Sequence, residues 1–286
     1  MRLSKHFQLS VGPSVPAARL LIEVQVVFRK ILSILGAYKI YERWLWYQVK
    51  SGVMPEHIAI ILDGNRRWAS EKDLNPWLGH EKGAENVERL LDWCIKLGVK
   101  STTLYAFSTE NFQRTPYEVG EILRIAEEEF RKILTDERIH KNKVRVKVLG
   151  RTALLPESLQ KLITDAEKAT QKYENHFLNF AFAYGGRAEI ADATKKIAEE
   201  VQKGRLSPDQ IDEQLIEQYL YTSYLPKQDP DLIIRTSGEE RLSGFLLWQS
   251  AYSELCFLDA YWPDFRAIDL LRSIRTFQSR QRRFGG

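Results

Sequence analysis

The sequence lacks most of the motifs by which common enzyme classes are recognised. It contains no G-x-x-x-x-G-K-[ST] or G-x-G-x-x-G loop, which excludes the usual phosphate-binding loops of nucleotide enzymes. It has no G-x-S-x-G elbow, and its five histidines lack the spacing of a zinc site. Internal repeats and low-complexity segments are also absent. Any chemistry must therefore come from residues that the fold brings together.

Cysteine and net charge are both low. Cys94 and Cys256 are the only cysteines, and both lie in apolar patterns, so we expect reduced core residues of a cytoplasmic protein and no disulfide. A net charge of +4 over 286 residues does not predict binding to nucleic acid. The apolar fraction of 44% and charged fraction of 28% predict a folded globular chain. Binding of a polyanion would have to depend on local clusters.

No apolar run is long enough to span a membrane. Residues 17–50 have helical periodicity, but Arg19, Glu23 and Arg29 interrupt it well before the ~20 apolar residues that a span requires. No cleavage site of a secretory signal follows. Two interpretations stay open: a helix lying on a membrane surface as a peripheral contact, and a helix packed on its own domain or on a partner subunit. We assign residues 1–50 to an N-terminal arm and helical extension and residues 51–286 to the main domain.

From residue 51 onward, short apolar runs alternate with amphipathic stretches. Strands are predicted at residues 57–62, 101–107, 144–149, 177–183, 231–235 and 255–258. Ser70 to Gly79 is predicted to be a loop, with helices beginning at about His80 and at Pro116. This alternation predicts an α/β fold. We expect a single domain with a central, mostly parallel six-stranded sheet flanked by helices.

Polar residues collect near the ends of these strands. The first predicted strand is followed by Asp63, Asn65, Arg66 and Arg67, and the second by Ser108, Glu110, Asn111 and Arg114. The fifth is followed by Arg235, Arg241 and Ser243, and Glu254 stands just before the sixth. Parallel strands bring such groups to one edge of a sheet, where ligands bind in open α/β folds. Several guanidinium groups in one cleft require an anion, and bidentate arginine favours phosphate. Asp63 and Glu254 are candidate carboxylate ligands of Mg²⁺.

Together these segments resemble the cis-prenyltransferase family, to which undecaprenyl diphosphate synthase belongs. The matching motifs, in order, are D-G-N-R-R-W-A from Asp63, G-H80, S-T-E-N-F-x-R from Ser108, R-T-S-G-E-x-R-L-S from Arg235 and Y-S-E254. The resemblance covers about residues 55–286 and implies that fold. It implies Mg²⁺-dependent condensation of isopentenyl diphosphate onto an allylic diphosphate, such as farnesyl or geranylgeranyl diphosphate. The product would be a long cis-polyprenyl diphosphate, precursor of a glycosyl carrier lipid such as dolichol.

The resemblance also implies roles for individual residues. Asp63 would hold Mg²⁺, with Glu254 completing the metal site, in an arrangement that involves the neighbouring subunit. The allylic diphosphate would be bound by Gly64, Asn65, Arg66, Arg67 and His80, and the isopentenyl diphosphate by Arg235, Arg241, Leu242 and Ser243. Trp68 and Phe112 would contact the isoprenoid. Replacing Asp63 with alanine is expected to abolish turnover and leave the protein folded.

The segment after the second strand is assigned to the substrate site by the same resemblance. Its residues are Ser108, Thr109, Glu110, Asn111, Phe112 and Arg114. Asn111 is the family's proposed proton-accepting position. Because a neutral amide is a poor base, ordering of the substrate or transfer of the proton to diphosphate is an alternative.

A few positions depart from the common family pattern. Arg66 is typical of archaeal and eukaryotic relatives, Phe112 replaces a frequent tryptophan, and Pro76 stands where an arginine phosphate contact is usual. The C-terminal segment Arg283–Gly285 implies a homodimer, because in the family it helps to complete a partner's active site. Two alternatives remain: a synthase of short chains and a non-catalytic accessory subunit.

Overall fold

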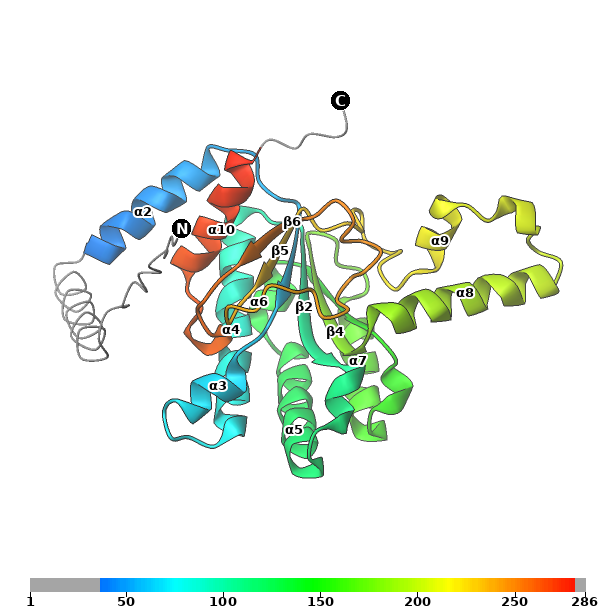
Figure 1. Ribbon diagram of the computed structural model, residues 1–286, viewed down its shortest axis with the longest axis horizontal. Coiled ribbons are helices and arrows are strands. Elements are labelled where there is room, and N and C mark those ends of the chain that lie inside the picture. The colour runs from blue at the N-terminus through cyan, green and yellow to red at the C-terminus, as the bar shows by residue number, and fades with distance from the viewer. Residues whose placement is uncertain (1–36, 281–286) are drawn as a thin grey trace, which may run out of the picture. The chain divides into compact units, whose positions relative to one another are not determined.

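The computed structural model describes residues 37–280 (Figure 1), and contacts within the chain define two units, Met1–Tyr47 and Gln48–Gly286. Helix α2 (Ala37–Lys50) continues across this division. The predicted boundary between residues 50 and 51 stays a prediction. Most of the stretch assigned to membrane contact, and the C-terminal segment Arg283–Gly285, lie outside the described residues. Within residues 37–280 no helix is both long and apolar enough to cross a membrane.

Six parallel strands form one sheet in the larger unit (Figure 1). Their spatial order is β3-β4-β2-β1-β5-β6. The strands are β1 (His57–Ile61), β2 (Ser101–Ser108), β3 (Val144–Leu149), β4 (His176–Tyr184), β5 (Leu232–Arg235) and β6 (Glu254–Phe257). Every pairing among them is parallel, which confirms the predicted α/β sheet. All residues of β1 are buried between β2 and β5, which explains its uninterrupted apolar run.

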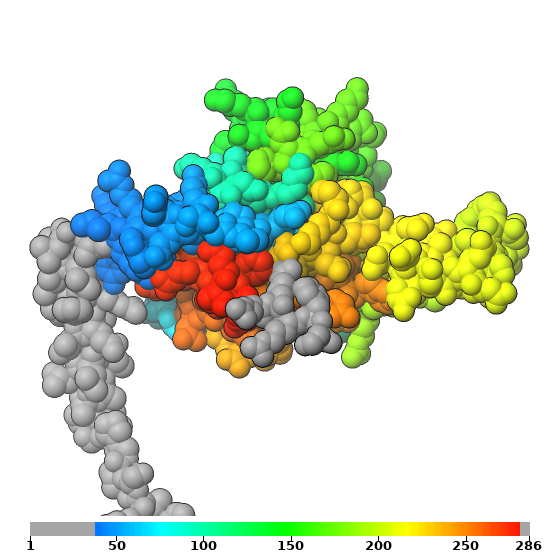
Figure 2. All heavy atoms as spheres, turned by 90° about the horizontal axis from the view of Figure 1, so that it is seen from above, coloured from blue at the N-terminus to red at the C-terminus, as the bar shows by residue number. Residues whose placement is uncertain are grey.

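The strands are connected by helices and short 3₁₀ turns. The helices are α3 (Asn65–Ser70), α4 (Pro76–Leu97), α5 (Pro116–Ile133), α6 (Glu137–Lys141), α7 (Glu157–Thr170), α8 (Gly186–Gln202), α9 (Glu213–Tyr219) and α10 (Ala267–Ser279). The 3₁₀ turns are η1 (Thr109–Gln113), η2 (Thr152–Leu154), η3 (Pro208–Gln210) and η4 (Trp262–Asp264). Within the larger unit, α8 and α9 extend sideways from the sheet (Figure 1), and the space-filling view shows the same region at its right edge (Figure 2).

The predicted loop from Ser70 to Gly79 is wrong in its second half. Helix α4 begins at Pro76, after Asn75 in an extended conformation. Proline is well suited to the first helical position, because its missing N–H would have no partner there and its φ angle is already helical. The helix therefore starts before the predicted position at His80, and it carries His80 in its first turns.

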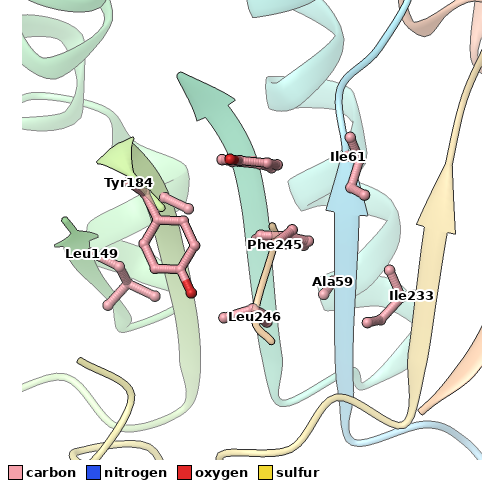
Figure 3. Close-up of a cluster of buried hydrophobic side chains, with 9 residues drawn as sticks. Ala59, Ile61, Leu149, Tyr184, Ile233, Phe245 and Leu246 are labelled. Atoms are coloured by element: carbon pink, nitrogen blue, oxygen red, sulfur yellow. The ribbon is translucent and has the colours of Figure 1, made fainter. Parts of the chain in front are cut away.

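The two faces of the sheet are covered differently. On one face, Phe180 and Phe182 of β4 point toward α4 and α5 across a cavity. On the other face, Ala59, Tyr105 and Ala181 form a compact cluster with two residues of the β5–β6 connection, Phe245 and Leu246 (Figure 3). Because successive side chains of a strand point to opposite faces of the sheet, Ala181 lies on the other face from its neighbours Phe180 and Phe182. The tightly packed face anchors the β5–β6 connection, and the open cavity lies on the opposite face.

Candidate active site

Asp63 follows β1 and is held at the carboxyl end of the sheet. Its backbone N–H donates to Thr236 Oγ1 at 3.0 Å, and its carboxylate accepts from Arg235 Nη2 at 2.7 Å. Arg67 Nη2 lies 3.6 Å from the other carboxylate oxygen. Partial burial alone would raise the pKa of Asp63, but hydrogen bonds from Arg235 and Ser237, with the charges of Arg235 and Arg67, lower that pKa below its usual value. Asp63 is therefore ionised at neutral pH.

Gly64 turns the chain from β1 into α3. Its φ angle is +102°, a conformation that L side chains rarely adopt. A Cβ atom there would lie 2.6 Å from Tyr261 Cδ1 and 3.0 Å from Ser237 Cβ. The motif glycine is thus required by both backbone conformation and close packing.

Arg235 ends β5 and connects Asp63 with the following loop. Its side chain is only 5% exposed, and Nη1 donates to Ser243 Oγ at 2.8 Å and to the carbonyl oxygen of Arg241. Its Nε has no hydrogen-bond partner among the described residues. Ser237 and Ser243 both have positive φ angles, 79° and 50°, which are strained for serine. This loop is held in an unusual conformation by the groups it presents to the site.

The same loop binds Arg67. Arg67 Nη2 donates to Ser237 Oγ at 2.6 Å, and Nη1 lies 3.5 Å from Glu239 Oε1. Glu239 also pairs with Arg241, whose side chain is 64% exposed. Glu239 therefore holds together two arginines that the sequence assigned to different diphosphates. Neither Ser237 nor Glu239 was singled out individually, although both lie inside the R-T-S-G-E motif.

Glu118 is a further residue that the sequence reasoning missed. Its carboxylate lies 3.0 Å from Arg114 Nη1, 3.5 Å from Arg66 Nε and 3.8 Å from His80 Nε2. Burial, followed by the charges of Arg114 and Arg66, lowers the pKa of His80 to about 4, so its imidazole is neutral at pH 7 and the contact with Glu118 is no ion pair there. The sequence does contain a signal for Glu118, because Thr115 and Glu118 form the T-x-x-E pattern of a helix start. In the structure Thr115 Oγ1 caps α5 by accepting from the Glu118 N–H at 3.3 Å.

A polar cleft and an apolar cavity meet beside these residues. The cleft, about 490 Å³, is lined by Asp63, Gly64, Asn65, Arg66, Arg67, Pro76, His80 and Arg114, among others. The apolar cavity, about 140 Å³, lies between α4, α5 and the sheet. Leu62, Asn65 and His80 line both spaces. The arrangement places a cationic site for an anionic group directly against a hydrocarbon-lined space.

The segment after β2 folds into turn η1. Asn111 Oδ1 accepts from the Ser108 N–H at 3.1 Å, so the side chain caps the turn. Phe112 packs edge-on against Phe107, with ring centroids 4.9 Å apart. Arg114 reaches the polar cleft, whereas Ser108, Thr109, Glu110, Asn111 and Phe112 line neither of the two cavities.

The other predicted residues that line neither cavity are Trp68, Arg235, Arg241, Leu242, Ser243 and Glu254. Lys72 Nζ lies 4.8 Å from the ring centroid of Trp68. Leu242 is packed against the buried cluster of Figure 3.

The expectation that Glu254 and Asp63 meet at one edge of the sheet is wrong within a single chain. Glu254 is the first residue of β6 and is paired in register with Leu232, the first residue of β5. Asp63 lies beyond the opposite, carboxyl end of the parallel strands. Glu254 instead accepts from Arg280 Nη1 at 2.7 Å. In a parallel sheet, residues that precede the strands and residues that follow them lie at opposite edges of the sheet.

The groups around Asp63 fit Mg²⁺ bound together with a diphosphate. Asp63 supplies an ionised, partly exposed carboxylate, and the neighbouring Asn65 Oδ1 is buried without a hydrogen-bond donor among the described residues. Within residues 37–280 no group of three His, Cys, Asp or Glu side chains could enclose a metal ion. One or two carboxylates, with the other oxygens from substrate phosphates and water, are typical of Mg²⁺ sites.

The chain belongs to the cis-prenyltransferase family. The family model described as "Putative undecaprenyl diphosphate synthase" matches residues 61–285. This confirms the resemblance seen in the motifs, and it makes the protein a transferase of prenyl groups.

Individual relatives cover nearly the same part of the chain. Relatives from Pyrococcus horikoshii and Methanopyrus kandleri are both described as tritrans,polycis-undecaprenyl-diphosphate synthase (geranylgeranyl-diphosphate specific). The first is 54% identical over 249 residues, covering 87% of this chain and 94% of its own. The second is 55% identical over 254 residues, covering 89% and 93%.

Two solved structures have the same fold. Lavandulyl diphosphate synthase from Lavandula x intermedia, in complex with dimethylallyl diphosphate, has a TM-score of 0.79 and 38% identity, covering 82% of this chain and 99% of its own. A structure described as a probable undecaprenyl diphosphate synthase from Campylobacter jejuni has a TM-score of 0.67 and 30% identity, covering 82% and 100%.

Proposed function

We propose that the protein is a Mg²⁺-dependent synthase that adds isopentenyl diphosphate repeatedly to geranylgeranyl diphosphate and makes a long cis-polyprenyl diphosphate. The observation that carries this proposal is the junction of the polar cleft with the apolar cavity at Leu62, Asn65 and His80. A prenyl diphosphate has the same two parts, an anionic head and a hydrocarbon chain. The relatives described as geranylgeranyl-diphosphate specific support the choice of primer.

Each round of the reaction would break one bond and form another. The C–O bond between C1 of the allylic chain and its diphosphate breaks, C1 bonds to the terminal alkene carbon of isopentenyl diphosphate, and one proton leaves. Asp63 would hold Mg²⁺, which when bound stabilises the negative charge that develops on the leaving diphosphate. Arg66 and Arg67 would bind the same group, and neutral His80 can donate a hydrogen bond to it.

The isopentenyl diphosphate would bind to Arg235, Arg241 and Ser243. Arg241 is exposed and paired with Glu239, so exchange of that carboxylate for a phosphate requires only a movement of one solvated side chain. Asn111 has its amide oxygen engaged by the Ser108 N–H. This contact favours a role in holding the turn and the substrate over a role as the base, and it leaves diphosphate as the proton acceptor.

The assembly belongs to the same proposal. We expect a homodimer in which Glu254 completes the metal site of a neighbouring subunit, because within one chain it lies at the opposite edge of the sheet from Asp63. Contact of residues 17–50 with a membrane surface, and use of the product as a glycosyl carrier lipid, remain expectations from the sequence.

The test uses purified protein with MgCl₂, labelled isopentenyl diphosphate and each of three primers: dimethylallyl, farnesyl or geranylgeranyl diphosphate. We expect butanol-extractable product, greatest with geranylgeranyl diphosphate, and none in EDTA. Chromatography of the dephosphorylated product against polyprenol standards separates a long-chain from a short-chain synthase. Absence of product with all three primers would refute the proposal and favour an accessory subunit.

A further inference from the structure

The apolar cavity runs lengthwise between two parallel helices. Three pairs of residues connect α4 with α5 in the same order along both helices: His80 with Glu118, Glu81 with Arg124, and Glu88 with Lys132, at 3.8, 2.7 and 3.7 Å. The cavity is therefore bounded at one end by the turns that carry His80 and Glu118. Its other end lies where α4 and α5 carry Glu88 and Lys132.

The lining changes character along this direction. At the near end, Asn65 and His80 are shared with the polar cleft. The middle is formed by aliphatic and aromatic side chains such as Val87, Ile125 and Phe180. Glu88 follows His80 by two turns of helix, about 12 Å along the axis. Around it the lining includes five charged side chains beside the apolar Leu91, Ile133 and Ile139. The charged ones are Glu88, Glu129, Lys132, Asp136 and Arg138, which we call the far-end cluster.

Ion pairs join the far-end cluster into one unit. Arg138 Nη2 lies 2.9 Å from Glu88 Oε2 and 2.6 Å from Asp136 Oδ2, which ties α6 to α4. Lys132 Nζ lies 2.7 Å from Glu129 Oε1 and 3.7 Å from Glu88 Oε1, which ties α5 to α4. The contact of Arg138 with Glu88 is the shortest between separate helices in this group.

We propose that the far-end cluster closes the prenyl cavity and limits product length, with Arg138 as the residue that maintains the closure. The inference rests on the proposed function, since it assigns the growing chain to this cavity. A chain extending along the apolar walls gains affinity with each buried methylene. At the cluster, the next methyl groups must separate and desolvate paired charges, which is unfavourable. The closing element is thus a charge barrier that lies beside the apolar Leu91, Ile133 and Ile139 of the same end.

The volume of the cavity supports a role for the cluster during growth. At about 140 Å³ the cavity is comparable to the ~150 Å³ cavities that accommodate benzene, so a twenty-carbon chain requires the helices to move apart. The far-end cluster joins all three helices that surround this end. Weakening it should ease both the widening of the cavity and passage beyond it.

Product length gives the first test. Arg138→Gln and Glu88→Gln should shift the product to longer chains by at least one isoprene unit, whereas Arg138→Lys, which keeps the charge, should stay close to wild type. Arg124→Gln is the matched control, because Arg124 also pairs across α4 and α5, with Glu81, and within α5 with Glu121 and Glu128, but does not line the cavity. An unchanged product distribution in active Arg138→Gln and Glu88→Gln would overturn the inference.

Binding of n-alkyl phosphates of increasing length tests the barrier without turnover. In the wild type, affinity should rise about fourfold per buried methylene and then level off at the length that reaches the far-end cluster. In Arg138→Gln the rise should continue for several more methylenes, and in Arg124→Gln it should not. The same levelling length in wild type and Arg138→Gln refutes the barrier. If the protein makes no product, the proposed function fails, and this series still shows whether the cluster closes the cavity.

Discussion

Replacing Asp63 with alanine should destabilise the fold as well as stop turnover. The sequence alone predicted loss of activity without unfolding, because removal of a charge from a polyanion site rarely lowers stability. The structure changes this expectation, since Asp63 is the charged partner of Arg235 at 2.7 Å and the Arg235 side chain is only 5% exposed. Without Asp63, a buried guanidinium keeps Ser243 and the Arg241 carbonyl as neutral partners and loses its counter-ion.

The size of the effect follows from the burial of the two partners. Removing one member of a fully buried ion pair destabilises by about 3–5 kcal/mol. The Asp63 side chain is 29% exposed, so water can reach part of the space it leaves. We therefore expect the free energy of unfolding to fall by about 2–3 kcal/mol. This corresponds to a decrease in Tm of roughly 4–12 °C for a protein of this size.

Urea denaturation at pH 7 measures this difference, with Glu254→Ala as the control. Glu254 and Arg280 are also 2.7 Å apart, but the Arg280 side chain is 46% exposed. Loss of that surface pair should change stability by no more than about 1 kcal/mol. Inorganic pyrophosphate should restore stability to Asp63→Ala, by about 2.7 kcal/mol at a hundred times its Kd, because an anion replaces the missing charge. Equal losses in the two variants, or no rescue by pyrophosphate, would refute this reasoning.

Three further outcomes follow from the site. Burial lowers the pKa of His57 and His80 to about 4, so as the pH falls below 6.5 the unfolded chain takes up these protons before the folded chain does. The free energy of unfolding should therefore fall between pH 6.5 and 4, by up to about 3 kcal/mol for each histidine. In urea titrations at pH 5 and 7, His80→Gln should reduce that loss. Gly64→Ala should lower the free energy of unfolding by about 1–3 kcal/mol and reduce turnover, because the new Cβ would meet Tyr261 at 2.6 Å and the φ angle is +102°. A variant of wild-type stability would contradict the close packing of Gly64 against Tyr261. Glu118→Gln removes a negative charge beside the polar cleft, so calorimetry at low salt should show pyrophosphate binding up to roughly tenfold tighter, while turnover falls. Equal affinities of wild type and variant would show that Glu118 does not compete with the diphosphate.

The strands were predictable because each is a short apolar run bounded by turn residues, and the buried strand β1 shows this most clearly. The start of α4 was not predictable from the sequence, because a proline in a polar segment is typical of both a loop and a helix start. The first turn of α4 packs against α3, where a Cβ on Gly79 would lie 2.0 Å from the carbonyl oxygen of Asn65, and this contact favours the helix at Pro76. Local patterns thus gave the elements, and the boundaries depended on contacts distant in sequence.

The candidate site divides in the same way. Asp63, Arg66 and Arg67 could be grouped because they follow a strand directly, and the direction of that strand fixes their edge of the sheet. Glu254 was misplaced because it precedes its strand, so the same rule puts it at the other edge. Glu118 was overlooked because two of its neighbours, Arg66 and His80, come from α3 and α4, and no spacing in the sequence relates them to α5. Only Arg114, four residues earlier, is close to it in sequence.

The family and the α/β class could be recognised from the sequence, because these depend on residue identity and on short-range periodicity; the residues proposed to bind a diphosphate stay a prediction. The tertiary structure alone decided which charges neutralise one another. Asp63 is paired with Arg235, and the cavity between α4 and α5 ends at Arg138. Such pairings depend on how distant segments approach in three dimensions, and the linear order of residues does not encode that distance directly.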